Sequence, residues 1–367
     1  MGNTWVELDL ATLKGNVCAL RKALTPGTEI IFVVKANAYG HGMVEVSRCA
    51  WACGVRWFAV VHADEGVELR RALPGAKILL LGAAHPSEVP AILRHRLIPV
   101  LVDERHALSL AKAVRGKARL ECHAKVDTGM GRLGFAREDA GRVLPKLARN
   151  PRLNITGLCS HLAASSGDDK AFSVRQFGRF HEVVAECETG GLSVPFLHLS
   201  NSGGILQDGG WDFHAVRAGI LLYGYARKPG EECRVKTRPF LHWKTRVLQV
   251  KKVPAGFPVS YDGTHVTRRA TCIATIDAGY SDGVSRLLSN KGFVLIRGKR
   301  CRIAGRVTMN LIAVDVGPNT KVREWDEVVL IGTQGREAIW ADEVGEWRQT
   351  IAYEVLTNIR TDDRRER

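Results

Sequence analysis

The sequence predicts an α/β protein: an N-terminal (β/α)8 barrel followed by a mainly antiparallel β domain. Short runs rich in β-branched residues recur at similar intervals through the first 225 positions. Amphipathic stretches separate them, and this alternation is typical of parallel strands joined by right-handed crossovers. Beyond position 227, strand-like runs follow one another with few helices, which is typical of an antiparallel sheet.

The barrel strands are predicted where apolar runs are nearly continuous, because such strands are buried on both faces. Eight strands close a (β/α)8 barrel, and a doubly wound open sheet is the alternative. The clearest predicted helices cover residues 11–24, 43–53, 64–73 and 171–188. The predicted strands cover residues 29–36, 55–63, 76–84, 96–103, 118–127, 153–162, 195–202 and 214–224.

A linker is predicted over residues 228–239, where glycine, proline and charged residues gather. A strand-like run also stands at the N-terminus, and we expect it to join the second domain. The predicted domains are therefore a barrel over 9–228 and a β domain over 235–367 that includes the strand 3–8. The strand-like runs of the β domain are 240–253, 257–266, 270–280, 292–307, 311–316 and 326–332.

The composition limits the classes of function. A net charge of +15 raises the question of nucleic-acid binding, but the basic residues are spread over both parts of the chain. The nine cysteines form no CxxC pair, so we expect free core thiols in a reducing cytoplasm and no metal site. No apolar run approaches ~18 residues, and the first residues do not resemble a secretory signal, so no membrane segment is expected.

Polar side chains lie at the ends of the predicted barrel strands, where barrels of this type carry their chemistry. Lys35 follows the apolar run IIFVV, and burial should lower the pKa of its amine. A neutral amine can attack a carbonyl and form a Schiff base, whereas a lysine that reaches solvent or pairs with an acid is the alternative. The other polar strand-end residues are Lys125, Asp127, His161, Asn201, Ser202 and Arg217.

Glycine-rich loops complete this pattern. GMGRLG (129–134) matches GxGxxG, but it follows the fifth strand, so we interpret it as a sharp turn that brings Lys125 and Arg132 together. Ser202 and two glycines follow strand seven, and Gly219 lies in strand eight. Loops after strands seven and eight commonly hold phosphate, although an ordinary glycine turn is the alternative. A nucleophilic lysine facing a phosphate site predicts pyridoxal 5′-phosphate.

The motifs resemble the alanine racemase family, the barrel class of pyridoxal-phosphate enzymes, and run in family order over essentially the whole chain. VKANAYGHG and KVDTGMGRLG are long and specific. The segments that carry the resemblance are VVKANAYGHG (33–42), KVDTGMGRLGF (125–135), CSHLAASSGD (159–168), LSNSGG (199–204), VRAGILLYG (216–224), VSYDGT (259–264), DAGYSDGVSR (277–286), AGRVTMN (304–310) and AYEVLTNIR (352–360).

The resemblance implies a two-base racemase that interconverts L- and D-alanine. Lys35 would hold the cofactor and act as one base, while Tyr261 of a second subunit would act from the opposite face. Arg217 would hydrogen-bond the pyridine nitrogen, supported by His161. The implied enzyme is a cytoplasmic homodimer with shared sites that supplies D-alanine for peptidoglycan.

Substrate contacts follow from the same resemblance. Arg132 would lie by the cofactor's phenolic oxygen and the substrate carboxylate, oriented by Lys125, a lysine often carbamylated in the family. Met309 of the partner would offer its backbone N–H to the carboxylate, and Tyr280 would narrow the opening. The remaining cofactor contacts would be Tyr39, Asn201, Ser202, Gly219, Ile220 and Tyr353.

Some positions depart from the family pattern and leave other functions open. Thr-Met-Asn-Leu at 308–311, Ala218 and Asp262 replace the commoner residues, which affects the expected substrate range more than the reaction type. The alternative within the reaction is a broader or serine-directed racemase. A decarboxylase of this barrel class and a non-catalytic cofactor carrier are less consistent with the motifs, because Tyr261 lies in a β domain that such carriers lack.

Overall fold

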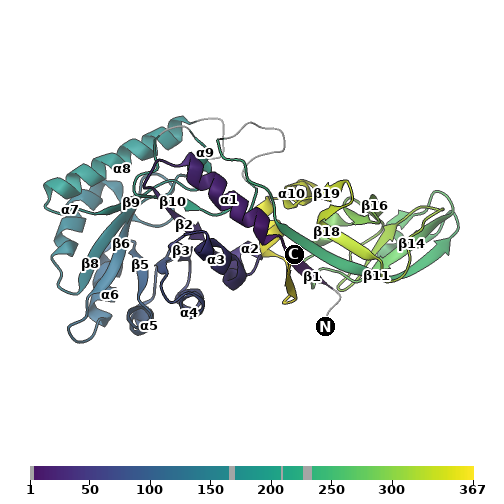
Figure 1. The fold of residues 1–367 in the computed structure, drawn as a ribbon, viewed down its shortest axis with the longest axis horizontal. Coiled ribbons are helices and arrows are strands. Elements are labelled where there is room, and N and C mark those ends of the chain that lie inside the picture. The colour runs from purple at the N-terminus through teal and green to yellow at the C-terminus, as the bar shows by residue number, and fades with distance from the viewer. Residues whose placement is uncertain (1–3, 165–169, 208–209, 226–233) are drawn as a thin grey trace. The chain divides into compact units, whose positions relative to one another are not determined.

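The structure, a computed structural model, describes residues 4–164, 170–207, 210–225 and 234–367 (Figure 1). The chain divides into two compact units. One comprises Lys14–Ala38 and Met43–Thr237, and the other comprises Met1–Leu13, Tyr39–Gly42 and Arg238–Arg367. Some predicted features lie outside the described residues, namely Asn3, Cys233 and positions 165–168 and 228–233.

The first unit contains the predicted closed barrel of parallel strands. The sheet runs from β2 through β10, and β10 pairs back onto β2 with Arg217 opposite Ile31, which excludes the open sheet. A short strand β7 (Phe135–Ala136) adds beside β6. The eight barrel strands are β2 (Glu29–Val33), β3 (Trp57–Val60), β4 (Lys77–Leu80), β5 (Leu97–Leu101), β6 (Leu120–Asp127), β8 (Leu153–Cys159), β9 (Phe196–His198) and β10 (Ala215–Ala218).

Helices surround these strands, as the amphipathic pattern predicts. In α8 the buried residues recur every three or four positions, from Ser173 to Cys187, so one face packs on the barrel. The side chain of Asp103 caps α6 by accepting the N–H of His106 at 2.7 Å. The helices of this part are α1 (Leu10–Ala23), α3 (Met43–Ala52), α4 (Ala63–Ala72), α5 (Val89–Arg94), α6 (Glu104–Ala113), α7 (Arg137–Ala148), α8 (Ala171–Thr189) and α9 (Ser202–Leu206).

The second unit is built on a nine-stranded, mainly antiparallel sheet. Its longest strand, β11, pairs with β1, β14 and β18. Helices α10 (Ala341–Arg348) and α11 (Ala352–Thr357) follow the sheet, and β12 (Pro258–Val259) and β13 (His265–Val266) form a small hairpin. The sheet strands are β1 (Trp5–Leu8), β11 (Leu241–Val253), β14 (Thr271–Ile276), β15 (Phe293–Ile296), β16 (Lys299–Ile303), β17 (Ile312–Asp315), β18 (Glu327–Gln334), β19 (Glu337–Ile339) and β20 (Arg364–Glu366).

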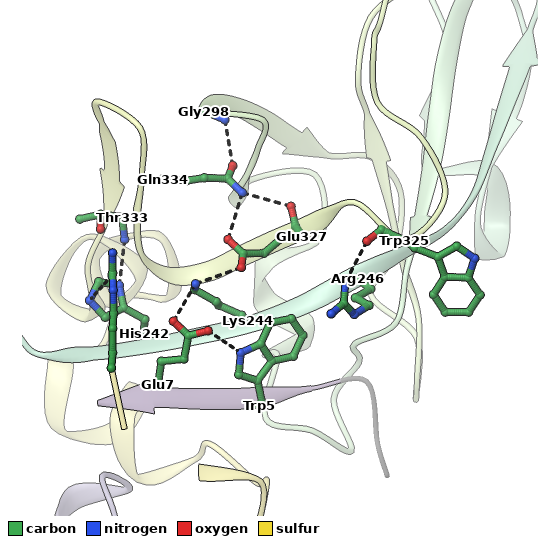
Figure 2. A network of polar contacts seen from close by, with 11 residues as sticks. Trp5, Glu7, His242, Lys244, Arg246, Gly298, Trp325, Glu327, Thr333 and Gln334 are labelled. Atoms are coloured by element: carbon green, nitrogen blue, oxygen red, sulfur yellow. Dashed lines mark hydrogen bonds and ion pairs between the residues drawn. The ribbon is translucent and has the colours of Figure 1, made fainter. Parts of the chain in front are cut away.

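A buried lysine joins the N-terminal strand to the rest of this sheet (Figure 2). Lys244 on β11 forms ion pairs with Glu7 on β1 at 2.8 Å and with Glu327 on β18 at 3.0 Å. The indole N–H of Trp5 donates to Glu7, and the amide of Gln334 donates to Glu327. The lysine thus compensates two carboxylates, and its loss would leave both without their cation.

We expect Lys244→Met to destabilise the β domain by about 2–3 kcal/mol. Removing one partner of a buried pair typically costs ~3–5 kcal/mol, and the effect is smaller here because Glu327 is partly exposed. The midpoint of urea unfolding measures this change. Lys252→Met, at an exposed position of the same strand, is the control, and equal midpoints for the two variants would contradict the expectation.

The effect of Lys244→Met should shrink in acid. Burial alone would raise the pKa of Glu7, but hydrogen bonds from Lys244 and Trp5 outweigh it and hold the pKa below the ordinary 4.5. A carboxyl whose folded-state pKa is depressed stabilises the fold above its unfolded-state pKa. That stabilisation is lost as the pH falls through the folded-state pKa. The urea midpoints of Lys244→Met and Lys252→Met should therefore converge as the pH falls through this value.

Candidate active site

Lys35 begins a left-handed turn at the carboxyl end of β2. In α2 (Lys35–Tyr39), Ala36, Asn37 and Ala38 have φ values of 51°, 52° and 53°. Such torsions cost L-residues roughly 1–2 kcal/mol each, and no glycine relieves them here. The strain lies beside the predicted nucleophile, where surrounding contacts must hold the backbone in place.

Three hydrogen bonds fix this turn. The N–H of Ala36 donates to Oε1 of Glu65 at 2.7 Å. The N–H of Ala38 donates to the carbonyl of Val34 at 2.8 Å, and the side-chain oxygen of Asn37 accepts the N–H of Met43 at 2.8 Å. The first of these links Lys35's turn to helix α4, a contact that sequence reasoning did not foresee.

Burial lowers the pKa of the Lys35 amine, and the Arg132 guanidinium lowers it further. The Glu65 carboxylate opposes this change and raises the pKa again in part. The net result is a lysine with more neutral amine at a given pH than a surface lysine has. This is the property that the attack on a carbonyl requires.

Arg217 is a fully buried cation in the middle of β10 rather than at its start. Its two terminal nitrogens donate to the carbonyls of Ser160, His198 and Leu199. They also contact Nδ1 of His198 at 2.7 Å and Nδ1 of His161 at 3.2 Å. Among the described residues, no acceptor faces its Nε–H, so one donor of a rigidly held guanidinium stays available.

Two histidines, His198 and His123, are hydrogen-bonded in series to this arginine. His198 accepts from Arg217 at Nδ1, and its Nε2 lies 2.9 Å from Nδ1 of His123. Burial, reinforced by Arg217, lowers the pKa of His123 to about 3 and that of His198 well below 6.5, so both rings are neutral. His198 therefore carries its proton on Nε2 and donates to His123. This order keeps His198 an acceptor for the arginine.

The glycine turn after β6 brings Lys125 and Arg132 together, as the sequence predicts. The Asp127 carboxylate accepts the N–H groups of Gly129 and Arg132, both at 2.9 Å, which shapes the loop. Gly134 has φ 137°, and a Cβ there would meet the backbone N of Asp127 at 2.6 Å. Burial lowers the pKa of Lys125, with a further contribution from Arg132.

Ser202 links the loops after β9 and β10. Its hydroxyl oxygen accepts the N–H of Gly219 at 3.1 Å and that of Leu221 at 3.2 Å. Asn201 caps α9 by accepting the N–H of Gly204 at 3.0 Å. Asn201 and Ser202 thus lie at the start of a short helix rather than in the seventh strand, and Gly219 and Ile220 follow β10.

The charges of this barrel end fit an anionic cofactor. The pKa of His161 falls to about 2, first through burial and then through four cations that surround it: Arg217, Lys125, Arg132 and Lys35. The available Nε–H of Arg217 suits a ring-nitrogen acceptor, and the Lys35 amine suits an aldehyde. Pyridoxal 5′-phosphate has both groups and a phosphate, so these residues fit it.

Four of the remaining predicted residues lie in the other unit, in two pairs. Tyr280 donates its N–H to Thr308, and Ser281 donates its N–H to Met309, so Tyr280 and Met309 lie close together. The rings of Tyr39 and Tyr353 are 5.8 Å apart between centroids. Burial, followed by the neighbouring Tyr353, raises the pKa of Tyr39.

Tyr261 is 69% exposed and lies between two residues with left-handed backbones. Ser260 has φ 62° and Asp262 has φ 60°, a conformation that aspartate tolerates better than most residues. The Asp262 carboxylate lies 2.8 Å from Nε of Arg306. The charge beside Tyr261 is therefore paired with an arginine of the segment between β16 and β17.

Sequence reasoning missed Glu65, His123 and His198. A signal existed for the first two: Glu65 stands three residues after the N-cap of α4, where an acid commonly caps a helix. His123 precedes Lys125 by two positions and so shares its strand face. Within the described ranges, no helix is long and apolar enough to cross a membrane, and no cluster of three His, Cys, Asp or Glu could hold a metal.

Comparison with known proteins identifies similar sequences along almost the whole chain. Residues 8–227 match the alanine racemase N-terminal domain and residues 240–367 match the alanine racemase C-terminal domain. The alanine racemase of Syntrophobacter fumaroxidans is 41% identical over 360 residues, which is 98% of this chain and 96% of that protein. The alanine racemase of Carboxydothermus hydrogenoformans is 41% identical over 361 residues, 98% of each chain.

Solved structures agree with this result. The alanine racemase from Bacillus anthracis with bound L-Ala-P has a TM-score of 0.92 at 34% identity, covering 98% of this chain and 93% of that one. The alanine racemase from Bartonella henselae with covalently bound pyridoxal phosphate has a TM-score of 0.87 at 28% identity, covering 100% and 99% of the two chains.

Proposed function

This chain belongs to the alanine racemase family, and on that premise we propose that it interconverts L-alanine and D-alanine with pyridoxal 5′-phosphate. The observation that carries the proposal is the cluster at the barrel end: a lysine of lowered pKa among several cations, of which Lys125 and Arg217 are buried, with an available arginine N–H. When bound, the cofactor supplies an electron sink that stabilises negative charge at the substrate Cα.

The cofactor would be held by groups from several loops. Lys35 would bind the aldehyde covalently, and the Nε–H of Arg217 would donate to the ring nitrogen. Because arginine keeps its proton at all working pH values, it can donate a hydrogen bond there without protonating the ring. The phosphate and neighbouring oxygens would contact Tyr39, Asn201, Ser202, Gly219, Ile220 and Tyr353.

Two bases are needed because racemisation removes the Cα proton from one face and returns a proton to the other. Lys35 would act on one face, and Tyr261 from a second subunit on the other. A phenol has an ordinary pKa of ~10, so a cation near it must favour the phenolate for proton transfer at neutral pH. The two arginines and two lysines near His161 support this role for the site that would receive Tyr261.

Arg132 would bind the substrate carboxylate and the cofactor's phenolic oxygen. Burial lowers the pKa of Lys125, which favours the neutral amine that carbamylation requires. A carbamylated Lys125 would carry a negative charge and would orient the Arg132 guanidinium. Met309 from the partner would offer its backbone N–H to the same carboxylate.

The pocket should prefer small amino acids, because Tyr280 and Tyr353 would narrow its opening. We expect kcat/KM for L-alanine to exceed that for L-serine by roughly 10–200-fold, the range that one small group can provide in such a pocket. L-Lysine should not be turned over. Initial rates by chiral chromatography test this. A higher kcat/KM for serine would favour the serine-directed alternative, and no racemisation of any of the three would contradict the function.

The cellular role follows from the same proposal. A homodimer in the cytoplasm would produce D-alanine there, and D-alanine is a precursor of peptidoglycan. The two domains would then have different roles. The barrel, over residues 9–228, would hold the cofactor. The β domain, over residues 235–367 with strand 3–8, would complete the partner's site.

A further inference from the structure

The lysine turn needs an external contact to keep its conformation. Ala36, Asn37 and Ala38 all have left-handed torsions, and none is glycine. Residues in such strained conformations persist where the surrounding structure over-determines them. The position of the Lys35 amine therefore depends on the groups that hold this backbone.

Glu65 binds this turn to one other backbone segment. Its Oε1 accepts the N–H of Ala36 at 2.7 Å. Its Oε2 accepts the N–H of Val61 at 2.9 Å and that of His62 at 3.1 Å. One ionised side chain thus joins the turn after β2 to the segment between β3 and α4. Hydrogen bonds to a charged acceptor are about twice as strong as neutral ones.

We propose that Glu65 is a positioning residue for Lys35: its carboxylate holds the left-handed turn and so aims the amine into the barrel end. The proposal rests on the proposed function, in which Lys35 binds the cofactor. It also predicts an electrostatic effect, because the negative charge of the Glu65 carboxylate favours the protonated form of the Lys35 amine. Among the described residues, the charged or titratable groups that interact with Lys35 are Arg132, His161 and Glu65, and of these Glu65 favours the protonated amine.

Glu65→Gln tests this in the full chain freed of cofactor. The glutamine amide has only one oxygen that can accept hydrogen bonds. Its NH2 group donates and cannot accept, so it would lie opposite a backbone N–H that now donates to the carboxylate. Binding of added pyridoxal 5′-phosphate, measured by the visible absorbance of the protein, should become roughly 10–100-fold slower; we call this binding capture. Loss of the negative charge should also move the pH midpoint of Lys35 acetylation downward, with exposed Lys14 as the internal reference.

Glu68→Gln is the matched control, since it makes the same change at an exposed position of α4. It should alter neither the capture rate nor the acetylation midpoint. A purely structural role for Glu65 would lower the unfolding temperature without moving the midpoint of Lys35. Unchanged capture and an unchanged midpoint in Glu65→Gln would overturn the proposal.

A second substitution separates the two effects of Glu65. Adding Ala36→Gly to Glu65→Gln relieves the left-handed strain at the residue that Glu65 contacts, because glycine adopts positive φ freely. Capture should recover, whereas the acetylation midpoint should stay low, and failure of capture to recover would refute the positioning role. If Glu65→Gln does not fold, Glu65→Asp serves, because it keeps the charge but is too short to reach Ala36. Capture should slow in it, and unchanged capture would again overturn the proposal.

Failure of this proposal and failure of the proposed function give different results. Acetylation reports on Lys35 without any turnover. If borohydride reduction of the loaded parent protein labels a residue other than Lys35, the proposed function is wrong. If it labels Lys35 but Glu65→Gln behaves as the parent does, the positioning role alone is wrong.

Discussion

Lys35→Ala should lower kcat/KM for alanine by more than about 10⁴-fold, because it removes both the covalent attachment of the cofactor and one of the two bases. The fold should survive, since the side chain lies at the end of β2 and makes no strand pairing. Racemisation by chiral chromatography and the visible absorbance of the loaded protein measure the two losses separately.

Lys14→Ala is the control for this change, since Lys14 is exposed on α1. Its absorbance and activity should equal those of the parent. Borohydride reduction followed by peptide mapping should fix the cofactor on the peptide that contains Lys35. A Lys35→Ala protein that keeps a reducible cofactor and full turnover would refute the assignment of this lysine.

Tyr261→Phe should lower racemisation in both directions by roughly 10²–10⁴-fold, the usual contribution of a positioned acid or base. Lys35 would still act as the base on its own face of the substrate Cα. Exchange of the Cα proton with deuterium from solvent should therefore persist for the enantiomer whose proton faces Lys35. Mass spectrometry of each enantiomer in heavy water measures this, with the parent protein as the control. Equal loss of exchange for both enantiomers would contradict the two-base assignment.

Mixing the two inactive variants tests whether Tyr261 acts across subunits. In a mixed dimer of Lys35→Ala and Tyr261→Phe, one site combines the intact lysine of one chain with the intact tyrosine of the other. Random exchange of subunits should restore about one quarter of the parent activity, because half of the dimers carry one intact site of two. No recovery after verified exchange would show that each chain uses its own tyrosine.

The barrel was predictable because its strands are buried on both faces and its helices are amphipathic. Those patterns are local in sequence, and all eight predicted strands form. The β20 strand was not predictable, since Arg364–Glu366 is short and charged and forms only because β1 lies beside it. The strand expected at 3–8, by contrast, forms as β1, although only the structure shows that its partners are β11 and β20.

By itself, the sequence determined the order of the elements, the family and the residues that the motifs carry, such as Lys35 and Arg217. Only the tertiary structure decided how those residues are held. The left-handed turn at Ala36–Ala38 has no residue signature, because alanine is common in right-handed helices as well. The contacts of Glu65 with that turn and of His123 with His198 join residues distant in sequence. Such contacts arise from packing, which fixes where a side chain points and therefore its pKa and its hydrogen-bond partners.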